Sequence, residues 1–265
     1  MADVEAQDSS DGAWIFVSHS HRDLSEVRRV RDALEAKGHQ PLLFFLKCLN
    51  DDAEIDDLVR REIEVRQFFL LCDSPNARTS RWVQEEVRLI GELRDKVRVD
   101  VALDGDWQAQ LERIDEISRR ATVFLSYSSG SKDSVRIARA LADALRARDY
   151  RVFLDVDSIP AGSLWSAEVQ NALDAALDHG SVLVLLSPEA LESEFVVAEV
   201  KHALERSDAE RSTRVIPIVA SRVDLTFDSL ERLGLEAIAR RQMLDFTVGD
   251  LDDNVSSLIR ILTQL

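Results

Sequence analysis

"ATVFLSYSSGSKDSVRIARALADALRARDYRVFLDVDSIPAGSLW", residues 121–165, is the stretch that decides the fold. It opens with an apolar run, VFL, which ends in a cluster of small hydroxyl residues. A helical pattern follows, in which Val135, Ala138, Leu141 and Leu145 recur at spacings of three and four. A second apolar run, RVFL, comes directly after that helix. Strand, helix and strand in this order predict a parallel sheet covered by helices.

The same arrangement occurs earlier in the chain, in "WIFVSHSHRDLSEVRRVRDALEAKGHQPLLFF", residues 14–45. The matching positions of the two copies are Phe16, Ser18 and Ser20 with Phe124, Ser126 and Ser128, and Ser80, Trp82 and Glu86 with Ser193, Phe195 and Glu199. The repeated unit is far longer than the roughly 20–50 residues of a solenoid repeat, so it is a whole domain. We therefore expect a disordered acidic tail over residues 1–12, a first domain over 13–120 and a second over 121–265.

Short apolar runs place the strands of both copies. In the second copy we expect strands near 122–126, 151–155, 181–186, 214–219 and 242–246, closed by an amphipathic helix that begins near Leu251. In the first copy we expect strands near 14–18, 41–46, 68–72 and 97–103 and a helix near 107–119, with a shortened end. That helix runs into the second copy without a Gly/Pro linker, which predicts two domains held against each other.

Composition excludes several classes of protein. The 265 residues carry a net charge of −16, and neither half is basic: residues 1–120 have 18 basic and 26 acidic side chains. Recognition of DNA or RNA is therefore not expected. The acidic N-terminal segment is no secretory signal, and no apolar run is long enough for a membrane span, so we expect a cytoplasmic protein without a membrane partner. Cys48 and Cys72 lie in apolar surroundings, which predicts reduced core thiols and no metal site.

Polar residues gather where the strands of the second copy should end, which is where open parallel sheets bind ligands. Ser126, Tyr127 and Ser128 follow its first strand, and the segment DVDSIPAG, 155–162, follows its second. Glu168 opens the next helix close to Trp165, and a carboxylate beside an aromatic wall can have a raised pKa or stabilise a developing cation. Helix capping explains the same serines and acids without any ligand, and that interpretation stays open.

Other chemistries find less support. The chain has neither G-x-x-x-x-G-K-[ST] nor G-x-G-x-x-G, so a P-loop and a dinucleotide-binding Rossmann motif are both absent. The run from Ser18 to His21 does not predict a hydrolytic triad, because adjacent residues of a strand point to opposite faces and Tyr127 replaces His19 in the second copy. A phosphoreceiver domain would need paired acids after the first strand, which neither copy has.

Both copies resemble Toll/interleukin receptor (TIR) domains of the bacterial kind. The resemblance rests on FVSHSHRD and VFLSYSSGSKD at the first strand, on DVDSIPAGSLW after the second strand of the second copy, and on SRWVQEEV and SEFVVAEV after the third strands. It covers nearly all of 121–265 and about 13–96. It implies two tandem flavodoxin-like α/β domains with the strand order 2-1-3-4-5 and helices on both faces of each sheet.

Many TIR domains of this kind cleave NAD⁺ at the nicotinamide–ribose bond, giving nicotinamide and ADP-ribose or a cyclic form. The resemblance therefore implies NAD⁺ as a substrate, with no cofactor and no metal. It implies a catalytic glutamate on the helix after the Pro/Gly loop, for which Glu168 is the best match and Glu62 the counterpart in the first copy. The residues expected to bind substrate are Ser126, Tyr127, Ser128, Asp155 and Trp165. The loop expected to contact a neighbouring domain comprises Asp157, Ser158, Ile159, Pro160, Ala161 and Gly162.

The other TIR function is that of a non-catalytic adaptor, which explains the same motifs. In either case the resemblance implies pairing with other TIR domains, within the chain or between copies, and a separate sensor or effector protein as a further partner. Similar bacterial chains imply a setting in bacterial immune signalling or antiphage defence, through NAD⁺ depletion or nucleotide signalling. Because Phe44 and Phe45 stand where the second copy has Asp155 and Val156, we expect a more apolar pocket in the first copy and the principal nucleotide site in the second.

Overall fold

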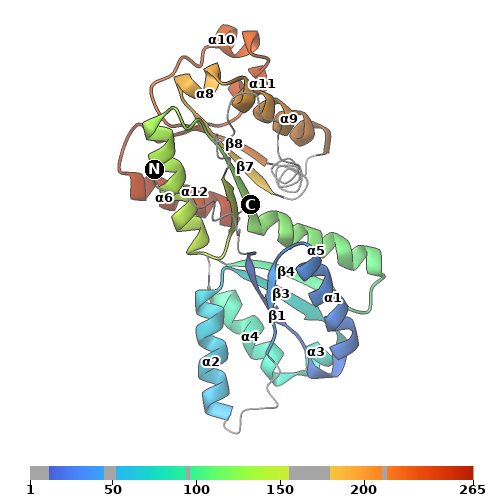
Figure 1. Cartoon of the computed structure of the whole chain (residues 1–265). Coiled ribbons are helices and arrows are strands. Elements are labelled where there is room, and N and C mark those ends of the chain that lie inside the picture. Colours follow the sequence, from blue (N-terminus) through green and yellow to red (C-terminus); the bar gives the residue numbers. More distant parts are fainter. Residues whose placement is uncertain (1–11, 45–51, 94–95, 155–179, 211–213, 265) are drawn as a thin grey trace, which may run out of the picture.

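The computed structural model describes residues 12–44, 52–93, 96–154, 180–210 and 214–264, with the side chains of 52–56 and 208–210 left out. Within these ranges the chain forms two α/β units, one in the lower and one in the upper half of Figure 1. Each unit is a parallel sheet with helices on both faces.

The first domain has a four-stranded parallel sheet in the order β2-β1-β3-β4. Its strands are β1 (Trp14–Ser18), β2 (Gln40–Leu42), β3 (Phe68–Asp73) and β4 (Val97–Ala102). Its helices are the 3₁₀ turn η1 (His21–Asp23), α1 (Leu24–Ala36), α2 (Asp52–Val65), α3 (Pro75–Thr79), α4 (Arg81–Glu92) and α5 (Trp107–Ala121).

The second domain has a five-stranded parallel sheet in the order β6-β5-β7-β8-β9. Its strands are β5 (Thr122–Ser126), β6 (Arg151–Leu154), β7 (Ser181–Leu186), β8 (Arg214–Val219) and β9 (Leu244–Asp245). Its described helices are α6 (Lys132–Arg146), α8 (Pro188–Glu192), α9 (Glu194–Glu210), α10 (Phe227–Arg232), α11 (Glu236–Ala239) and α12 (Leu251–Gln264).

Counted within each copy, the strand orders are 2-1-3-4 and 2-1-3-4-5, so the predicted topology is confirmed. In the first domain α5 follows β4 directly, where the second domain inserts α10, α11 and β9. Two strands are shorter than expected. β2 ends at Leu42, and the last strand, expected over 242–246, is reduced to the two residues Leu244 and Asp245.

Alternating side chains of each strand supply two separate cores. In β1, Ile15 and Val17 face α1 and α5, whereas Phe16 faces α2 and α4 and stacks on Phe69 of β3 with the ring centroids 5.5 Å apart. This alternation explains why the strand sequence is apolar at consecutive positions, as expected of a sheet that is covered on both faces.

A single core continues from one domain into the other. The cluster that packs under α1 and α5 also contains Val123 and Leu125 of β5 and buried residues of α6 and α12. The boundary between the two domains is called the seam below. There the ring of Phe68 from the first domain meets the ring of Tyr150 from the second edge-on, with centroids 4.9 Å apart. The last helical residue, Ala121, is followed at once by the first strand residue, Thr122. The expectation that the domains are held against each other is therefore confirmed.

A turn that follows the first helix of each copy shows how the seam is fixed. The turn after α1 places Gly38 at φ 79°, a left-handed conformation that favours glycine, whereas the corresponding residue after α6 is Asp149 at φ 63°. The Asp149 carboxylate accepts a hydrogen bond from the backbone N–H of Gln67 at 3.2 Å and pairs with Arg66 at 3.0 Å. These contacts across the seam compensate the cost of an aspartate in this backbone conformation.

Cys72 is buried in the first core as a free thiol, and burial raises the pKa of that thiol far above its usual range. It is therefore the inert core cysteine that the sequence predicts. Cys48 lies outside the described residues. In the part of the chain that the structure describes, no helix is both long and apolar enough to cross a membrane.

Arg66 is the residue whose loss should uncouple the domains. Its guanidinium pairs with Asp149 and Glu62 and lies over the ring of Trp14, 4.8 Å from the centroid. We expect Arg66→Met to lower the free energy of unfolding by about 1–3 kcal/mol, because it leaves the largely buried Asp149 carboxylate without its cation. Denaturant unfolding followed by circular dichroism measures this.

The matched control is Arg31→Met on α1, whose pairs with Asp32 and Glu35 are solvent-exposed. It should leave the free energy of unfolding nearly unchanged, because exposed ion pairs contribute little to stability. Equal effects of the two substitutions would show that Arg66 does not hold the seam.

Candidate functional site

Each domain buries one glutamate against a serine at the carboxyl end of its first strand. In the first domain the hydroxyl of Ser18, the last residue of β1, donates to Oε2 of Glu86 on α4. In the second domain the hydroxyl of Ser126, the last residue of β5, donates to Oε2 of Glu199 on α9 at 2.9 Å. All four side chains are buried, and the pairs lie at the sheet edge where α/β proteins bind ligands.

The phase of the helix after β3 and β7 explains why a glutamate is directed inward. Ser80 caps α4 by accepting from the N–H of Val83, and Ser193 accepts from the N–H of Val196 in the same way. From that start, Val83, Glu86 and Ile90 fall on one buried face of α4. The same S-x-x-V-x-x-E spacing therefore delivers a carboxylate to the same place in both domains.

Burial changes the acid–base behaviour of Glu86. Removal from water raises the pKa of its carboxyl to about 7, against the smaller lowering effect of the hydrogen bond from Ser18. At neutral pH this group is close to half ionised. A carboxylate with such a pKa can exchange a proton or stabilise a developing cation in the physiological range.

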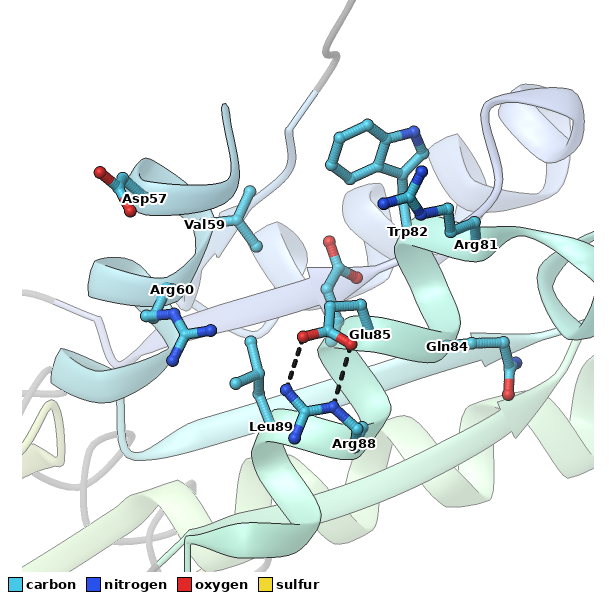
Figure 2. Close-up of a pocket in the computed structure, with 10 residues that line it drawn as sticks. Asp57, Val59, Arg60, Arg81, Trp82, Gln84, Glu85, Arg88 and Leu89 are labelled. Atoms are coloured by element: carbon cyan, nitrogen blue, oxygen red, sulfur yellow. Dashed lines mark hydrogen bonds and ion pairs between the residues drawn. The ribbon is translucent and has the colours of Figure 1, made fainter. Parts of the chain in front are cut away.

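A cleft of about 730 Å³ adjoins Glu86 between α2 and α4 (Figure 2). Its lining residues are Asp57, Val59, Arg60, Arg81, Trp82, Gln84, Glu85, Glu86, Arg88 and Leu89. Arg88 is held by Glu85, and this hydrogen bond from Arg88 is the main reason why the pKa of the Glu85 carboxyl lies below its usual range. Arg60 and Arg81 also line the cleft, and their positive charges contribute to lowering the pKa of the Glu85 carboxyl.

The expectation of a more apolar pocket beside Phe44 and Phe45 stays a prediction, because Phe44 is not among the residues that line this cleft. Its lining combines three arginines with one tryptophan, while Phe44 packs against the core near Phe16, with ring centroids 5.7 Å apart. Phe45 lies outside the described residues.

The sequence-predicted site residues fall into two groups. Ser126 pairs with Glu199 as described above. Ser128 is buried and accepts from the N–H of Gly130 at 3.3 Å, which is a turn contact, and Tyr127 is packed in the core that crosses the seam. Outside the described residues lie Asp155, Asp157, Ser158, Ile159, Pro160, Ala161, Gly162, Trp165 and Glu168, which stay predictions.

Glu62, the expected counterpart of Glu168 in the first domain, pairs with Arg66 at 3.1 Å and so belongs to the network at the seam. It is not among the residues that line the cleft. In the described part of the chain, no group of three histidine, cysteine, aspartate or glutamate side chains is placed to hold a metal ion.

Glu86 and Glu199 are the candidates that sequence reasoning overlooked. Both stood in the segments SRWVQEEV and SEFVVAEV, which served to align the repeat and to carry the TIR resemblance but gave neither glutamate a role. The available signal was a glutamate on the apolar face of a helix, at the same distance from a capping serine in both copies. Burying an acid costs free energy, so a buried glutamate at the same position of both repeats indicates a specific role for its carboxyl group.

Comparison with known proteins agrees with this architecture. The family model described as the TIR domain matches residues 15–119 and 123–259. Among solved structures, the TIR domains of the activated Roq1 resistosome, which recognises the pathogen effector XopQ, share 18% identity and a TM-score of 0.42 over 54% of this chain and 99% of that one. The TIR domain of the Toll-related receptor TRR-2 from Hydra magnipapillata shares 14% identity and a TM-score of 0.36 over 53% of this chain and 96% of that one.

A comparison with curated proteins gives no match. The two matched segments coincide with the two sheets and leave only short stretches of the chain uncovered. The chain belongs to the TIR domain family and carries two TIR domains in tandem.

Proposed function

We propose that this protein cleaves NAD⁺ at the nicotinamide–ribose bond and that the carboxylates of Glu86 and Glu199 support the reaction. The observation that carries the proposal is the buried serine–glutamate pair, which occurs at the same sheet edge in both domains. In the first domain it adjoins a cleft large enough for a nucleotide, since ligand pockets typically have volumes of about 300–1,000 Å³.

The chemistry needs one ionised carboxylate and no metal. When the C1′–N bond breaks, its electron pair stays on nicotinamide, whose ring nitrogen loses its positive charge, and the ribose becomes an oxocarbenium ion. A fixed carboxylate stabilises that cation. Addition of water to C1′, with release of a proton, gives ADP-ribose, and attack by a nitrogen of the adenine gives a cyclic form.

The described surroundings of Glu86 suit this substrate. Arg60 and Arg81 supply positive charge for the two phosphates, and Trp82 offers an aromatic face for a planar ring. In the second domain Glu194 and Phe195 stand at the positions of Arg81 and Trp82. The sequence favours the second domain as the site of NAD⁺ cleavage, whereas the charges of the described residues favour the first. Which domain is catalytic therefore needs a direct test.

A second function, that of a non-catalytic interaction module, is favoured by a different observation. Both serine–glutamate pairs are deeply buried, with exposed fractions of 8% for Glu86 and 3% for Glu199. A buried pair of this kind can serve the fold alone. In that case the protein acts by binding other TIR domains or a sensor protein. Under either function we propose a setting in antiphage defence.

Substitution of each candidate acid decides among these alternatives. We expect Glu86→Gln or Glu199→Gln to reduce nicotinamide release from NAD⁺ by at least about 100-fold in the domain concerned, because the charge that stabilises the cation is lost. The double substitution should abolish it. Release is measured by chromatography at high protein concentration, and Glu92→Gln is the matched control, because Glu92 is exposed at the end of α4 and does not line the cleft.

Other results would redirect the proposal. Loss of activity in Glu168→Ala, with full activity in the Glu86 and Glu199 variants, would place the site where the sequence first predicted it. If the wild-type protein releases no nicotinamide even when concentrated, and binds a TIR domain in a pull-down, it is an interaction module.

The raised pKa of Glu86 predicts a pH dependence. In a Glu199→Gln background, kcat/KM for NAD⁺ should rise with pH through about 7, as the Glu86 carboxyl ionises. The Ser18 hydrogen bond lowers this pKa, so Ser18→Ala should shift the rise to higher pH. A merely structural role of Ser18 would lower activity equally at every pH.

The pH dependence of the free energy of unfolding tests the raised pKa of Glu86 independently of activity. The folded protein binds a proton at Glu86 more tightly than the unfolded chain does, so this group's contribution to stability is complete below about pH 4.5 and is lost as the pH rises to about 7. The free energy of unfolding of Glu86→Gln, relative to wild type, should therefore increase over this window by on the order of 3 kcal/mol. A constant difference from pH 4 to pH 8 would contradict the raised pKa.

A further inference from the structure

A second cavity, of about 490 Å³, lies at the seam between the two TIR domains, away from both serine–glutamate pairs. The first domain contributes the end of α1 and the turn that follows it, α5 contributes Ser118, and the second domain contributes Thr122, Arg151 and Phe153. Its lining residues are Glu35, Ala36, Lys37, Gly38, His39, Ser118, Thr122, Arg151 and Phe153.

Arg151 is a half-buried cation that lacks a carboxylate partner within the described ranges. Its Nη1 donates to the backbone oxygen of Lys37 at 2.8 Å, and its guanidinium lies 4.6 Å from the ring centroid of Phe153. Its Nε is buried, and no described residue accepts a hydrogen bond from it. Burial lowers the pKa of this guanidinium, as expected for a cation that is removed from water without a counter-ion.

The other charges at the cavity are already paired. Lys37 pairs with Asp115, and Glu35 at the rim pairs with Arg31 at 3.6 Å. The uncompensated charge of the described lining is therefore the positive charge of Arg151. A buried cation of this kind is costly unless an anion completes it.

Ser118 supplies a second unsatisfied group. Its side chain is 2% exposed, and its Oγ has no hydrogen-bond partner in the described part of the chain. Thr122 does not fill this role, because its hydroxyl donates to the backbone oxygen of Ser118 at 2.9 Å. Buried hydroxyl groups normally have a partner, so the unpartnered hydroxyl of a residue that lines the cavity is a candidate donor to a ligand.

We propose that the seam cavity binds the phosphate group of a small molecule, with Arg151 and Ser118 as hydrogen-bond donors. A guanidinium matches the geometry of phosphate oxygens, and a hydroxyl can donate to a further oxygen of the same group. The ligand contacts both domains at once, so its binding stabilises their packed arrangement. The site does not depend on the reaction proposed above.

Two substitutions in the full-length chain test the site, with phosphate, pyrophosphate and AMP as probes at constant ionic strength. Binding is measured by calorimetry and by the shift in melting temperature. We expect Arg151→Met to abolish binding and Ser118→Ala to weaken it about tenfold, the effect of one hydrogen bond to a charged group. Without ligand, Ser118→Ala should be at least as stable as wild type, because it removes an unsatisfied buried hydroxyl.

Arg148→Met is the matched control, because Arg148 is exposed in the turn between α6 and β6 and donates to the backbone oxygen of Ala144. It should leave binding unchanged. All proteins carry Arg60→Ala and Arg81→Ala, which remove the proposed phosphate contacts of the NAD⁺ cleft, so that binding there is distinguished from binding at the seam. If Arg151→Met does not fold, Ser118→Ala alone decides.

The proposal is overturned if no probe binds the wild-type seam, or if Ser118→Ala and Arg151→Met bind the probes as tightly as Arg148→Met does. Equal affinities for phosphate and AMP would identify free phosphate as the ligand. An AMP affinity at least tenfold higher would identify a nucleotide.

Discussion

The direct passage from Ala121 to Thr122 is the constraint on which the arrangement of this protein depends. The last helix of the first domain ends at one residue and the first strand of the second domain begins at the next. No linker residue between them allows one domain to rotate freely relative to the other, so the position of the second sheet is fixed by the end of α5. The continuous apolar cluster under α1, α5, α6 and α12 follows from this geometry. The second domain therefore always has a TIR neighbour, at a concentration that no separate chain could supply.

The two serine–glutamate pairs show that a buried carboxylate at the sheet edge lowers the stability of each domain. Withdrawing an acid from water costs free energy, and one hydrogen bond from a serine recovers only part of it, as the high pKa of Glu86 indicates. A purely structural position could use a leucine at lower cost. That both domains keep the glutamate, the serine and the capping residue in the same geometry is the strongest structural argument for a chemical role.

Sequence periodicity was sufficient for most of the fold, because strands buried on both faces and helices with one apolar face leave unmistakable patterns. It was less reliable at the sheet edges, where β2 and β9 have a neighbour on one side only and end early. The site was harder to predict. Hydroxyl and acidic residues in the sequence drew attention to the loops. Glu86 and Glu199 instead lie on the buried faces of helices, and their acid–base properties depend on burial in the folded structure, which the sequence does not display. Phe44 shows a related difficulty, since an apolar residue near a strand end can pack against the core as readily as it lines a pocket.

The shortened first domain is best understood together with the seam. Without a fifth strand, β4 is the edge of its sheet, and α5 takes the place beside α1 that α12 takes beside α6. The exposed edge is partly closed, because the backbone oxygen of Asp100 accepts from Arg113 on α5 and the side chains of Arg98 and Asp100 pair with each other. Charged residues of this kind discourage a further strand from adding to a free edge. Because α5 follows β4 directly, it has two structural roles. It covers the first sheet, and its last residue positions the first strand of the second domain.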